Sequence, residues 1–461
     1  MTGSQKPVTP ASSVLSRTPR PTDSAVAATL AQAFLNSSRW TSAGLIEAGA
    51  QVLGARRRWL GPVVTLVLRS YPRPPVDAPR ELGAMILGCE PFAQARAKAA
   101  VQRKPLRLAH YVLEPMVARE NGQPRVPRLD TLADLAAMLE LTGGELEWFA
   151  DPQQWNRLAV PALQHYRYVW RRRPGRLPRL LEIPAPRLRG IQRTVLRDLL
   201  YPLEIHDAAH GFVPGRSAVT GATRHTGQDL VLTLDLVTFF ARVTAGKVFG
   251  VLRRAGYTEA VAHRLVGLCT HVVPPRVLSA MPPGGSPTER FALRQALSQP
   301  HLPQGAPSSP VLANLSLRRL DARLTGLADS FEAVYTRYAD DLAFSGGKKL
   351  ARRSAAFIRF ATVTIGEEGH GVNQPKSRLR TAGERQQVTS VVVNERTNAV
   401  RSEFDRLKAT LHNCWTHGPD SQNRDRHADF RAHLLGRISW MASLNSDRGA
   451  RLLRDFQRIQ W

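Results

Sequence analysis

The sequence predicts an α+β fold in which helical segments flank a central segment rich in strands. Residues 24–155 and 401–461 place apolar side chains at helical intervals, whereas residues 156–400 hold short runs of β-branched and aromatic residues. At 461 residues the chain exceeds one average domain, so two or three folded units are expected. The prediction is therefore a strand-containing centre with a helical region on either side.

The N-terminal region is expected to comprise a tail and then a helical extension. Residues 1–23 are rich in Pro, Ser and Thr and hold few large apolar side chains, which favours disorder. Residues 24–155 are expected to be helical. The stripe from Leu132 to Leu139 marks the clearest helix, which Gly143 is expected to end. No residue pattern in this extension indicates chemistry.

The stretch from Val334 to Ser345 is predicted to form a strand, a tight turn and a second strand. β-Forming residues flank a short polar turn that carries Asp340 and Asp341. Because side chains alternate between the two faces of a strand, adjacent carboxylates need a turn to serve one site together. Two neighbouring acids repel each other, and a divalent cation relieves that repulsion. The alternative is that the two acids merely suit the turn.

A third acid, Asp235, interrupts the nearly continuous apolar run from Leu230 to Phe240. An aspartate at the end of a buried strand is costly unless it is paired, hydrogen-bonded or bound to a metal. Three carboxylates on neighbouring strands are what two-metal nucleotidyl transfer requires, because one ion activates the attacking hydroxyl and the other stabilises the leaving pyrophosphate. The pattern predicts such a site at Asp235, Asp340 and Asp341.

The order of these motifs resembles that of reverse transcriptases. Phe240 follows Asp235 by five residues, Gln304-Gly305 comes before Ser309-Pro310, and Tyr338 stands two residues before the acid pair. The resemblance implies an RNA-directed DNA polymerase with a right-hand fold. In that fold, residues 156–400 would form α+β fingers and a palm with an antiparallel sheet, and residues 401–461 a helical thumb.

The resemblance also implies roles for individual side chains in the nucleotide site. The three acids would bind two Mg²⁺ ions. Phe240 would lie under the sugar and exclude a 2′-hydroxyl, which favours dNTPs, although ordinary core packing is the alternative. Gln304 would contact the nucleotide or the template. Arg179 matches a basic residue near the triphosphate, and Lys376 matches a lysine that approaches the leaving pyrophosphate.

Three further residues are expected at the primer and template. Tyr338 would lie by the primer end, which follows from its place beside the acid pair in the family pattern. Gly305 and Arg216 belong to glycine-containing blocks, in which glycine allows close approach and Arg216 could grip a phosphate with two hydrogen bonds. Residues 273–300, which are rich in Pro and Gly, are expected to form a loop or small insertion.

The charge of the chain indicates a polyanionic partner. Lys and Arg number 64 against 37 acidic residues, a net charge of +27, and the isoelectric point is about 11.2. A GC-rich genome accounts for the choice of Arg over Lys but not for this excess. Arginines alternate with aromatic residues over 166–179, which suits a strand pair that contacts phosphates and stacks on bases. A solvated basic hairpin is the alternative there.

Two motifs resemble those of retron reverse transcriptases, with one departure in each. Gly221-Ala222-Thr223-Arg224-His225 stands where retron enzymes carry Asn-Ala-x-x-His, and Val388-Thr389-Ser390 stands where they carry Val-Thr-Gly. His225 on its own is more typical of a structural histidine. The departures are Gly221 for Asn and Ser390 for Gly.

The retron resemblance implies several partners. They are a cognate noncoding RNA that serves as template and supplies a priming 2′-hydroxyl, dNTPs, the RNA–DNA hybrid product, and an effector protein from the same locus in antiphage defence. One alternative is a reverse transcriptase of another bacterial lineage, intron-type or free-standing. Another is an RNA-binding scaffold with a silent palm, which the intact acid triad argues against.

Cysteine usage and hydropathy bear on the compartment. Only Cys89, Cys269 and Cys414 are present, without metal-type spacing, which argues against a disulfide framework or zinc site and fits a reducing cytoplasm. No apolar run of spanning length and no signal-peptide pattern occurs, so a soluble cytoplasmic protein without a membrane partner is expected.

Overall fold

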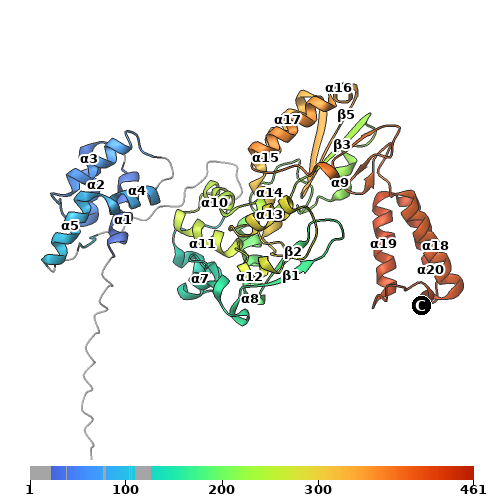
Figure 1. Cartoon of the computed structure of the whole chain (residues 1–461), viewed down its shortest axis with the longest axis horizontal. Coiled ribbons are helices and arrows are strands. Elements are labelled where there is room, and N and C mark those ends of the chain that lie inside the picture. The colour runs from blue at the N-terminus through green and yellow to red at the C-terminus, as the bar shows by residue number, and fades with distance from the viewer. Residues whose placement is uncertain (1–21, 38, 76–78, 103, 105, 110–125) are drawn as a thin grey trace, which may run out of the picture. The chain divides into compact units, whose positions relative to one another are not determined.

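A computed structural model of the chain divides into two compact units, Met1–Pro115 and Met116–Trp461 (Figure 1). The structure describes residues 22–37, 39–75, 79–102, 104, 106–109 and 126–461. Most of the tail predicted over residues 1–23 lies outside the described residues, and Asp23 already belongs to the first helix. Within the described residues, no helix combines the length and the apolar character needed to cross a membrane.

The first unit, blue in Figure 1, is a bundle of short helices with its own core. Buried apolar side chains from each helix, such as Leu30, Leu45, Val64, Ile86 and Phe92, pack together in its centre. Threonine side chains cap the first two helices and accept hydrogen bonds from their exposed backbone amides. The helices are α1 (Asp23–Leu35), α2 (Ser42–Leu53), α3 (Leu60–Ser70), α4 (Pro79–Gly88) and α5 (Glu90–Val101).

Two more helices of the predicted extension, α6 (Leu132–Met138) and α7 (Gly143–Ala150), belong to the second unit. They share its largest core and pack against α11 (Glu259–Cys269). Gly267 is required at that contact, because a Cβ there would lie 2.1 Å from the carbonyl oxygen of Ala150. The helical extension predicted over 24–155 is therefore divided between the two units.

The expectation that Gly143 ends a helix is wrong, because this glycine begins α7. Thr142 and Glu145 form a capping box in which each side chain accepts a hydrogen bond from the other residue's backbone amide. The preceding helix, α6, ends at Met138, and Glu140 two residues later has a positive φ of 54°. The capping residues, rather than the glycines, set this boundary.

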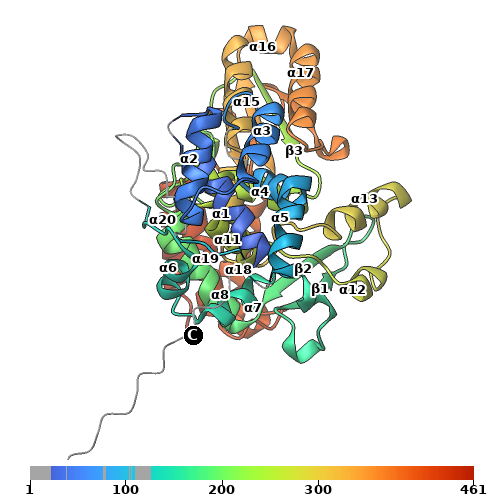
Figure 2. The same cartoon turned by 90° about the vertical axis from the view of Figure 1, so that its left-hand side faces the viewer.

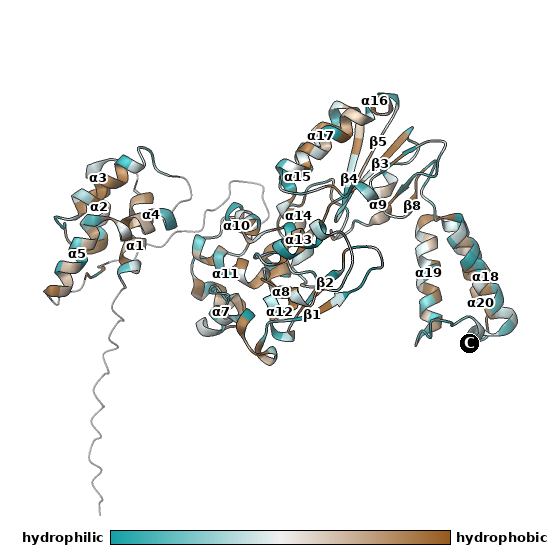
Figure 3. Cartoon of the chain, in the orientation of Figure 1, coloured by the Kyte–Doolittle hydropathy of each residue, from teal (hydrophilic) through white to brown (hydrophobic). Residues whose placement is uncertain are grey.

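The central sheet of the second unit has four antiparallel strands in the order β4-β5-β3-β6. Alternate side chains enter different cores: Leu232 and Phe344 pack in the largest core, and Val231 and Ala343 pack with the C-terminal helices. Figure 3 shows β3 and β5 largely in the hydrophobic colour, as expected for strands covered on both faces. The strands are β3 (Leu230–Asp235), β4 (Ala333–Tyr338), β5 (Asp341–Gly346) and β6 (Arg378–Thr381).

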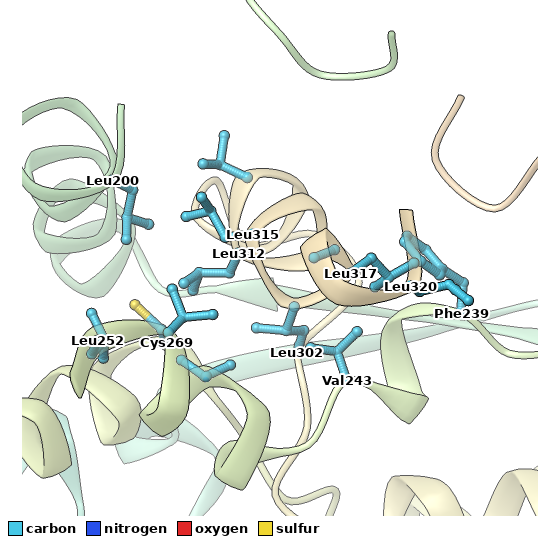
Figure 4. Packing of buried hydrophobic residues seen from close by; sticks show 14 of the residues in the cluster. Leu200, Phe239, Val243, Leu252, Cys269, Leu302, Leu312, Leu315, Leu317 and Leu320 are labelled. Carbon is cyan, nitrogen blue, oxygen red and sulfur yellow. The ribbon is translucent and has the colours of Figure 1, made fainter. Parts of the chain in front are cut away.

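The sheet confirms the predicted α+β class, the antiparallel hairpin over 334–345 and the strand that ends at Asp235. The largest core of the second unit includes buried residues of α14 (Ser309–Ser316), the helix that follows the Gln304-Gly305 motif. Figure 4 shows Leu312 and Leu315 facing Leu200 and Cys269 in this core. Two longer helices, α15 (Arg318–Ser330) and α17 (Ser354–Glu367), pack against each other, and α15 also packs on β4.

A separate hairpin of β1 (Tyr166–Arg171) and β2 (Arg179–Pro184) has a small core of its own. Of the two expectations for residues 273–300, a loop or a small insertion, the loop is wrong, because this segment forms α12 (Pro275–Ser279) and α13 (Pro287–Leu297). Each of these helices has a proline in its first turn, where the missing amide costs nothing. Figure 2 shows both helices beside the hairpin, where Trp170 donates a hydrogen bond to the carbonyl oxygen of Val277 at 3.0 Å.

The C-terminal residues form three helices, coloured red in Figure 1. Their core contains Leu407 and Leu411 from the predicted stripe and extends to the small β7–β8 pair and to α9. The elements are α9 (Ala218–Thr223), β7 (Gln387–Val388), β8 (Val391–Val392), α18 (Arg401–His417), α19 (Phe430–Leu444) and α20 (Ser446–Gln457).

Candidate active site

Three acids that are distant in the sequence lie together at one end of the central sheet. Asp235 is the last residue of β3 and pairs in register with Asp341, the first residue of β5. Asp340 lies in the turn between β4 and β5, and its carbonyl oxygen accepts a hydrogen bond from the amide of Leu236 at 2.9 Å. Ala339 makes the tight turn possible by adopting a left-handed conformation, with φ of 56°.

The acids destabilise one another's charges. Desolvation within the cleft, followed by the charges of Asp340 and Asp235, raises the pKa of Asp341 to about 6, although Lys376 opposes the shift. Desolvation and the charge of Asp235 likewise raise the pKa of Asp340, against the positive charges of Lys376 and Arg179. This end of the sheet therefore concentrates negative charge that the protein only partly neutralises.

Two side chains after the hairpin contact Asp235. Lys376 forms an ion pair with its Oδ1 at 2.6 Å, and the Nδ2 of Asn373 donates a hydrogen bond to its Oδ2 at 2.9 Å. The backbone amide of Asn373 also donates to the carbonyl oxygen of Asp235 at 2.7 Å. Sequence reasoning found Lys376 but overlooked Asn373, which stands three residues before it.

The donor set fits a divalent cation, since clustered carboxylates are the ligands that hard cations prefer and the raised pKa values report unneutralised charge. Over the described ranges, no three His, Cys, Asp or Glu side chains are already gathered as ligands around one point. Both carboxylate oxygens of Asp235 instead contact Lys376 and Asn373. A metal ion bound by all three acids would therefore compete with Lys376 for Asp235.

A cleft of about 710 Å³ opens in front of the acids. Its walls come from the β1–β2 hairpin, the end of β3, the β4–β5 turn, α13 and the segment around Lys376. The structure brings most of the predicted site residues to this one cleft. They are Arg179, Asp235, Phe240, Gln304, Tyr338, Asp340, Asp341 and Lys376.

Aromatic rings lie beside the acids in the cleft. Phe240 begins the short 3-10 helix η4 (Phe240–Arg242), and its ring centroid lies 5.0 Å from that of Phe239 and 6.5 Å from that of Phe212. The ring of Phe212 lies 6.2 Å from that of Tyr338, and the residue is 43% exposed. Phe212 was not predicted, because its ring reaches the cleft from a left-handed conformation, φ 59°, that no pattern signals.

The Gln304-Gly305 motif is anchored on β2. The amide of Glu182 donates a hydrogen bond to the carbonyl oxygen of Gln304 at 2.9 Å. Gly305 has φ of 138°, and a Cβ there would lie 2.7 Å from the carbonyl oxygen of Glu182, so no larger residue fits. Gly305 is absent from the cleft lining and contacts the protein's own backbone, whereas Gln304 lines the cleft.

A buried ion pair supports the same loop. The carboxylate of Glu182 lies 3.1 Å from Nε2 of His301, and both side chains are almost fully buried. Burial alone would lower the pKa of His301, but the charge and hydrogen bond of Glu182 raise it above its ordinary value. This buried contact thus joins the β1–β2 hairpin to the loop that carries Gln304.

Arg216 has a different environment from the one predicted. Its Nη1 donates to the carbonyl oxygens of His206, Asp207 and Ala209 at 3.1, 3.0 and 2.8 Å, and its Nη2 contacts the Asp207 carboxylate at 2.9 Å. Arg216 does not line the cleft. Its guanidinium therefore organises the preceding loop, because both Nη1 and Nη2 are already bonded to acceptors of the protein.

His225 is fully buried and contacts one side chain from each strand of the hairpin. Its Nδ1 lies 2.7 Å from Oγ of Ser345 on β5, and its Nε2 lies 2.7 Å from Oγ1 of Thr336 on β4. Burial, together with His210 and Arg224, lowers the pKa of His225 to about 3, so the imidazole is neutral. The interpretation of His225 as a satisfied structural histidine fits these contacts.

The two departures from the retron pattern line one cavity of about 250 Å³ behind the hairpin. A Cβ at Gly221 would lie 3.2 Å from the side chain of His210, so this position tolerates little more than glycine unless His210 shifts. Ser390 has φ of 68°, a conformation that suits the glycine of the family pattern. Gly221 and Ser390 thus both alter the wall of this cavity.

Comparisons with known proteins agree with these motifs. A family model described as Reverse transcriptase (RNA-dependent DNA polymerase) matches residues 173–397, which include every residue that lines the cleft. The chain is 37% identical over 339 residues to the retron Mx65 reverse transcriptase of Myxococcus xanthus, an alignment that covers 71% of this chain and 72% of that protein.

Two further relatives carry similar descriptions. Identity to the retron Mx162 reverse transcriptase of Myxococcus xanthus is 35% over 311 residues, which covers 64% of this chain and 60% of that protein. Identity to the retron Ec86 reverse transcriptase of Escherichia coli is 29% over 293 residues, which covers 63% of this chain and 80% of that protein. The similarity therefore extends beyond the acid motifs to most of the second unit's length.

Proposed function

This chain belongs to the bacterial retron-type reverse transcriptases and is an RNA-directed DNA polymerase, and from that membership we propose that it copies part of a cognate structured noncoding RNA into single-stranded DNA. The observation that carries the proposal is the set of three acids at one end of the central sheet, facing a cleft with basic and aromatic walls. The retron-named relatives favour this lineage over an intron-type or free-standing one.

We assign Asp235, Asp340 and Asp341 as the ligands of two Mg²⁺ ions, since reverse transcriptases generally use divalent metal ions. Bound there, the ions would activate the attacking hydroxyl and stabilise the leaving pyrophosphate. The protein's part is to hold the carboxylates at one sheet edge before the reaction begins. Lys376 and Arg179 add positive charge where the triphosphate's negative charge must be stabilised.

The aromatic wall gives the proposed nucleotide site its selectivity. Phe240 lies under the sugar in this proposal and excludes a 2′-hydroxyl, and its contacts with Phe239 and Phe212 restrict how far its ring moves. Gln304 contacts the nucleotide or template from the opposite loop. Tyr338 precedes the acid turn by two residues and lies by the primer end.

The larger divisions follow the right-hand polymerase pattern. We propose that residues 156–400 are fingers and palm, that 401–461 are the thumb, and that the helices within 24–155 help to hold the folded RNA. The arginines at 171–173 and 176, beside the cleft, would neutralise template phosphates. Arg216 and Gly305 would act indirectly, by shaping the backbone beside the primer and template.

The retron assignment carries further proposals about the product. The noncoding RNA would supply both the template and an internal 2′-hydroxyl as primer, and dNTPs would extend it into an RNA–DNA hybrid. We place this synthesis in the cytoplasm and in antiphage defence, with an effector protein from the same locus. These proposals rest on the retron-named relatives and on the two subclass motifs.

Expression of the protein with its flanking genomic DNA tests the proposal. The cells should yield a short single-stranded DNA attached to a small RNA, and ribonuclease treatment should leave a ribonucleotide on its 5′ end that debranching enzyme removes. The Asp340→Asn protein, expressed from the same locus, is the control and should give no such DNA. A templated DNA with an unmodified 5′ end would refute 2′-hydroxyl priming, and absence of any templated product would refute the retron function.

A further inference from the structure

Arg337 on β4 is fully buried two residues before the acid turn, and its guanidinium donates four hydrogen bonds to neighbouring acceptors. Its Nε and Nη2 donate to the two carboxylate oxygens of Asp321 at 2.8 and 2.6 Å. Its Nη1 donates to Oδ1 of Asn314 at 2.9 Å and to the carbonyl oxygen of Ala339 at 3.1 Å. One end of a buried ion pair is thus bonded directly to the left-handed residue of the turn.

The partners of Arg337 are held in turn. Asp321 on α15 also accepts a hydrogen bond from the hydroxyl of Tyr335 at 2.9 Å. Asn314 on α14 donates through Nδ2 to the carbonyl oxygen of Gly211 at 2.8 Å. A Cβ at Gly211 would lie 2.8 Å from the amide nitrogen of Ala339, so this segment packs directly on the turn. Two helices and a loop therefore grip the turn from the protein interior.

The backbone of Arg337 adds to this grip. Its amide donates to the carbonyl oxygen of Ala208 at 2.7 Å, and its carbonyl oxygen accepts from the amide of His210 at 2.7 Å. Although burial disfavours its charge, Asp321 raises the pKa of Arg337 above its ordinary value, so the guanidinium stays protonated. These hydrogen bonds are directional, and the fully buried guanidinium is not exposed to solvent.

Stability is a poor explanation for such a pair. Removing two charges from water costs much of what their attraction returns, and apolar side chains of similar volume often serve stability equally well. A non-glycine residue in the left-handed region is disfavoured, and it persists where surrounding structure holds it. The bond from Arg337 to the carbonyl oxygen of Ala339 supplies such a hold.

We propose that Arg337, fixed by Asp321 and Asn314, is a positioning residue that sets the Ala339-Asp340 turn so that Asp340 faces the same metal ions as Asp235. This inference rests on the proposed role of Asp340 in polymerisation. According to this inference, the Arg337–Asp321 pair holds the acids in position, and the stability of the fold does not depend on it. A displacement of about 1 Å at such a turn is enough to reduce turnover strongly.

The decisive variant is the double substitution Arg337→Met with Asp321→Leu, which replaces the ion pair by apolar side chains. We expect it to fold and to bind primer–template as the wild type does. Its kcat for primer extension on RNA should fall roughly 10- to 100-fold, and the Mg²⁺ concentration for half-maximal activity should rise. Arg337→Lys, which keeps the charge but loses the planar fork, should show the same defects in smaller measure.

Two proteins measured in parallel separate the possible outcomes. Arg323 lies on α15, the helix that also carries Asp321, and forms a surface ion pair with Glu367 and Glu368. Arg323→Met removes this pair and should keep the kcat and the Mg²⁺ dependence of the wild type. Asp340→Asn tests the proposed function itself. If the double variant and Arg337→Lys keep wild-type kcat and Mg²⁺ dependence while Asp340→Asn is inactive, the positioning role is overturned alone. Activity in Asp340→Asn would instead overturn the proposed acid site. Unfolding of both Arg337 variants would assign the pair to stability and overturn the inference.

Discussion

The acid end of the central sheet and the site of His225 are built on the same two strands, yet their electrostatics are opposite. Around His225 both ring nitrogens have hydroxyl partners, and the imidazole is neutral. At the acid end, Asp340 and Asp341 hold charges that burial and each other destabilise. The hairpin thus contacts one polar group whose hydrogen bonds are complete, the His225 imidazole, and carries two carboxylates whose charges are only partly neutralised.

The difference separates scaffold from site. A buried polar group with all its partners rigidifies its surroundings and requires nothing further. Carboxylates whose pKa values are raised are stabilised by positive charge, which Lys376 and Arg179 supply in part and a bound metal ion would supply further. Substitutions around His225 should therefore change stability and spare the chemistry, whereas substitutions at the acid end should do the reverse.

The largest expected effect is at Asp340. Asp340→Asn should lower Mg²⁺-dependent extension of a DNA primer on an RNA template by at least about 10³-fold, because the amide has no charge to hold a metal ion. Its thermal midpoint should equal or exceed that of the wild type, since burial and repulsion by Asp235 destabilise the native carboxylate in the folded protein. The matched control is Asp329→Asn, an exposed acid at the end of α15. Wild-type extension by Asp340→Asn would contradict the assignment of the turn.

His225 should show the opposite behaviour. His225→Leu leaves the hydroxyls of Thr336 and Ser345 buried without partners and should cost roughly 2–4 kcal/mol, seen as a lower urea midpoint for the second unit. Polymerase activity per folded molecule should remain near that of the wild type. The triple variant that adds Thr336→Val and Ser345→Ala removes the orphaned hydroxyls and should recover part of the loss. No recovery in the triple variant would show that the orphaned groups are not the cause.

Local patterns were sufficient for the parts of the site that lie within one element. The polar turn between β-forming runs predicted the β4–β5 hairpin, and the apolar run before Asp235 predicted β3. Antiparallel pairing then places Asp235 opposite Asp341, because both stand at strand ends. The acid site could be found from sequence since each acid has a local signal and the motifs occur in a recognisable order.

Contacts between distant segments could not be found in the same way. Asn373 reaches Asp235 only because the chain returns beside β3, and Asp321 meets Arg337 only because α15 packs on β4. Arg216 was expected to bind phosphate because its residue type allows it, but the fold provides three carbonyl oxygens first. Composition misled at 273–300, where proline starts two helices rather than interrupting structure.

Substitution of Phe240 tests whether the preference for dNTPs over rNTPs is also determined at the acid end. Phe240→Ala should lower the preference for dNTPs over rNTPs, measured as the ratio of kcat/KM values, by about 10-fold, because space opens for a 2′-hydroxyl. Phe357→Leu is the matched control, since this ring is fully buried in the core and does not line the cleft, so its loss should affect stability alone. An unchanged ratio in Phe240→Ala would make this ring part of the core as well.

The smallest expected effect, and the one that probes the acid end most directly, is its response to pH. The pKa of Asp341 is raised to about 6, above an unfolded value near 3.9. Between about pH 4 and 6 the folded protein therefore keeps a proton that the unfolded chain has lost, so Asp341 makes stability fall as pH rises through this window. Activity should have the opposite trend, because the ionised carboxylate is the proposed metal ligand.

Primer extension at limiting Mg²⁺ should consequently decline to about half as pH falls to about 6. Raising Mg²⁺ should move this midpoint to lower pH, since the ion and the proton compete for the same oxygens. Lys376 lowers the pKa of Asp341, so Lys376→Ala should move the midpoint upward even though its maximal rate is reduced. A pH midpoint that changes neither with the Mg²⁺ concentration nor in Lys376→Ala would mean that another group sets the pH dependence. The charges around Asp341 would then have no effect on the activity.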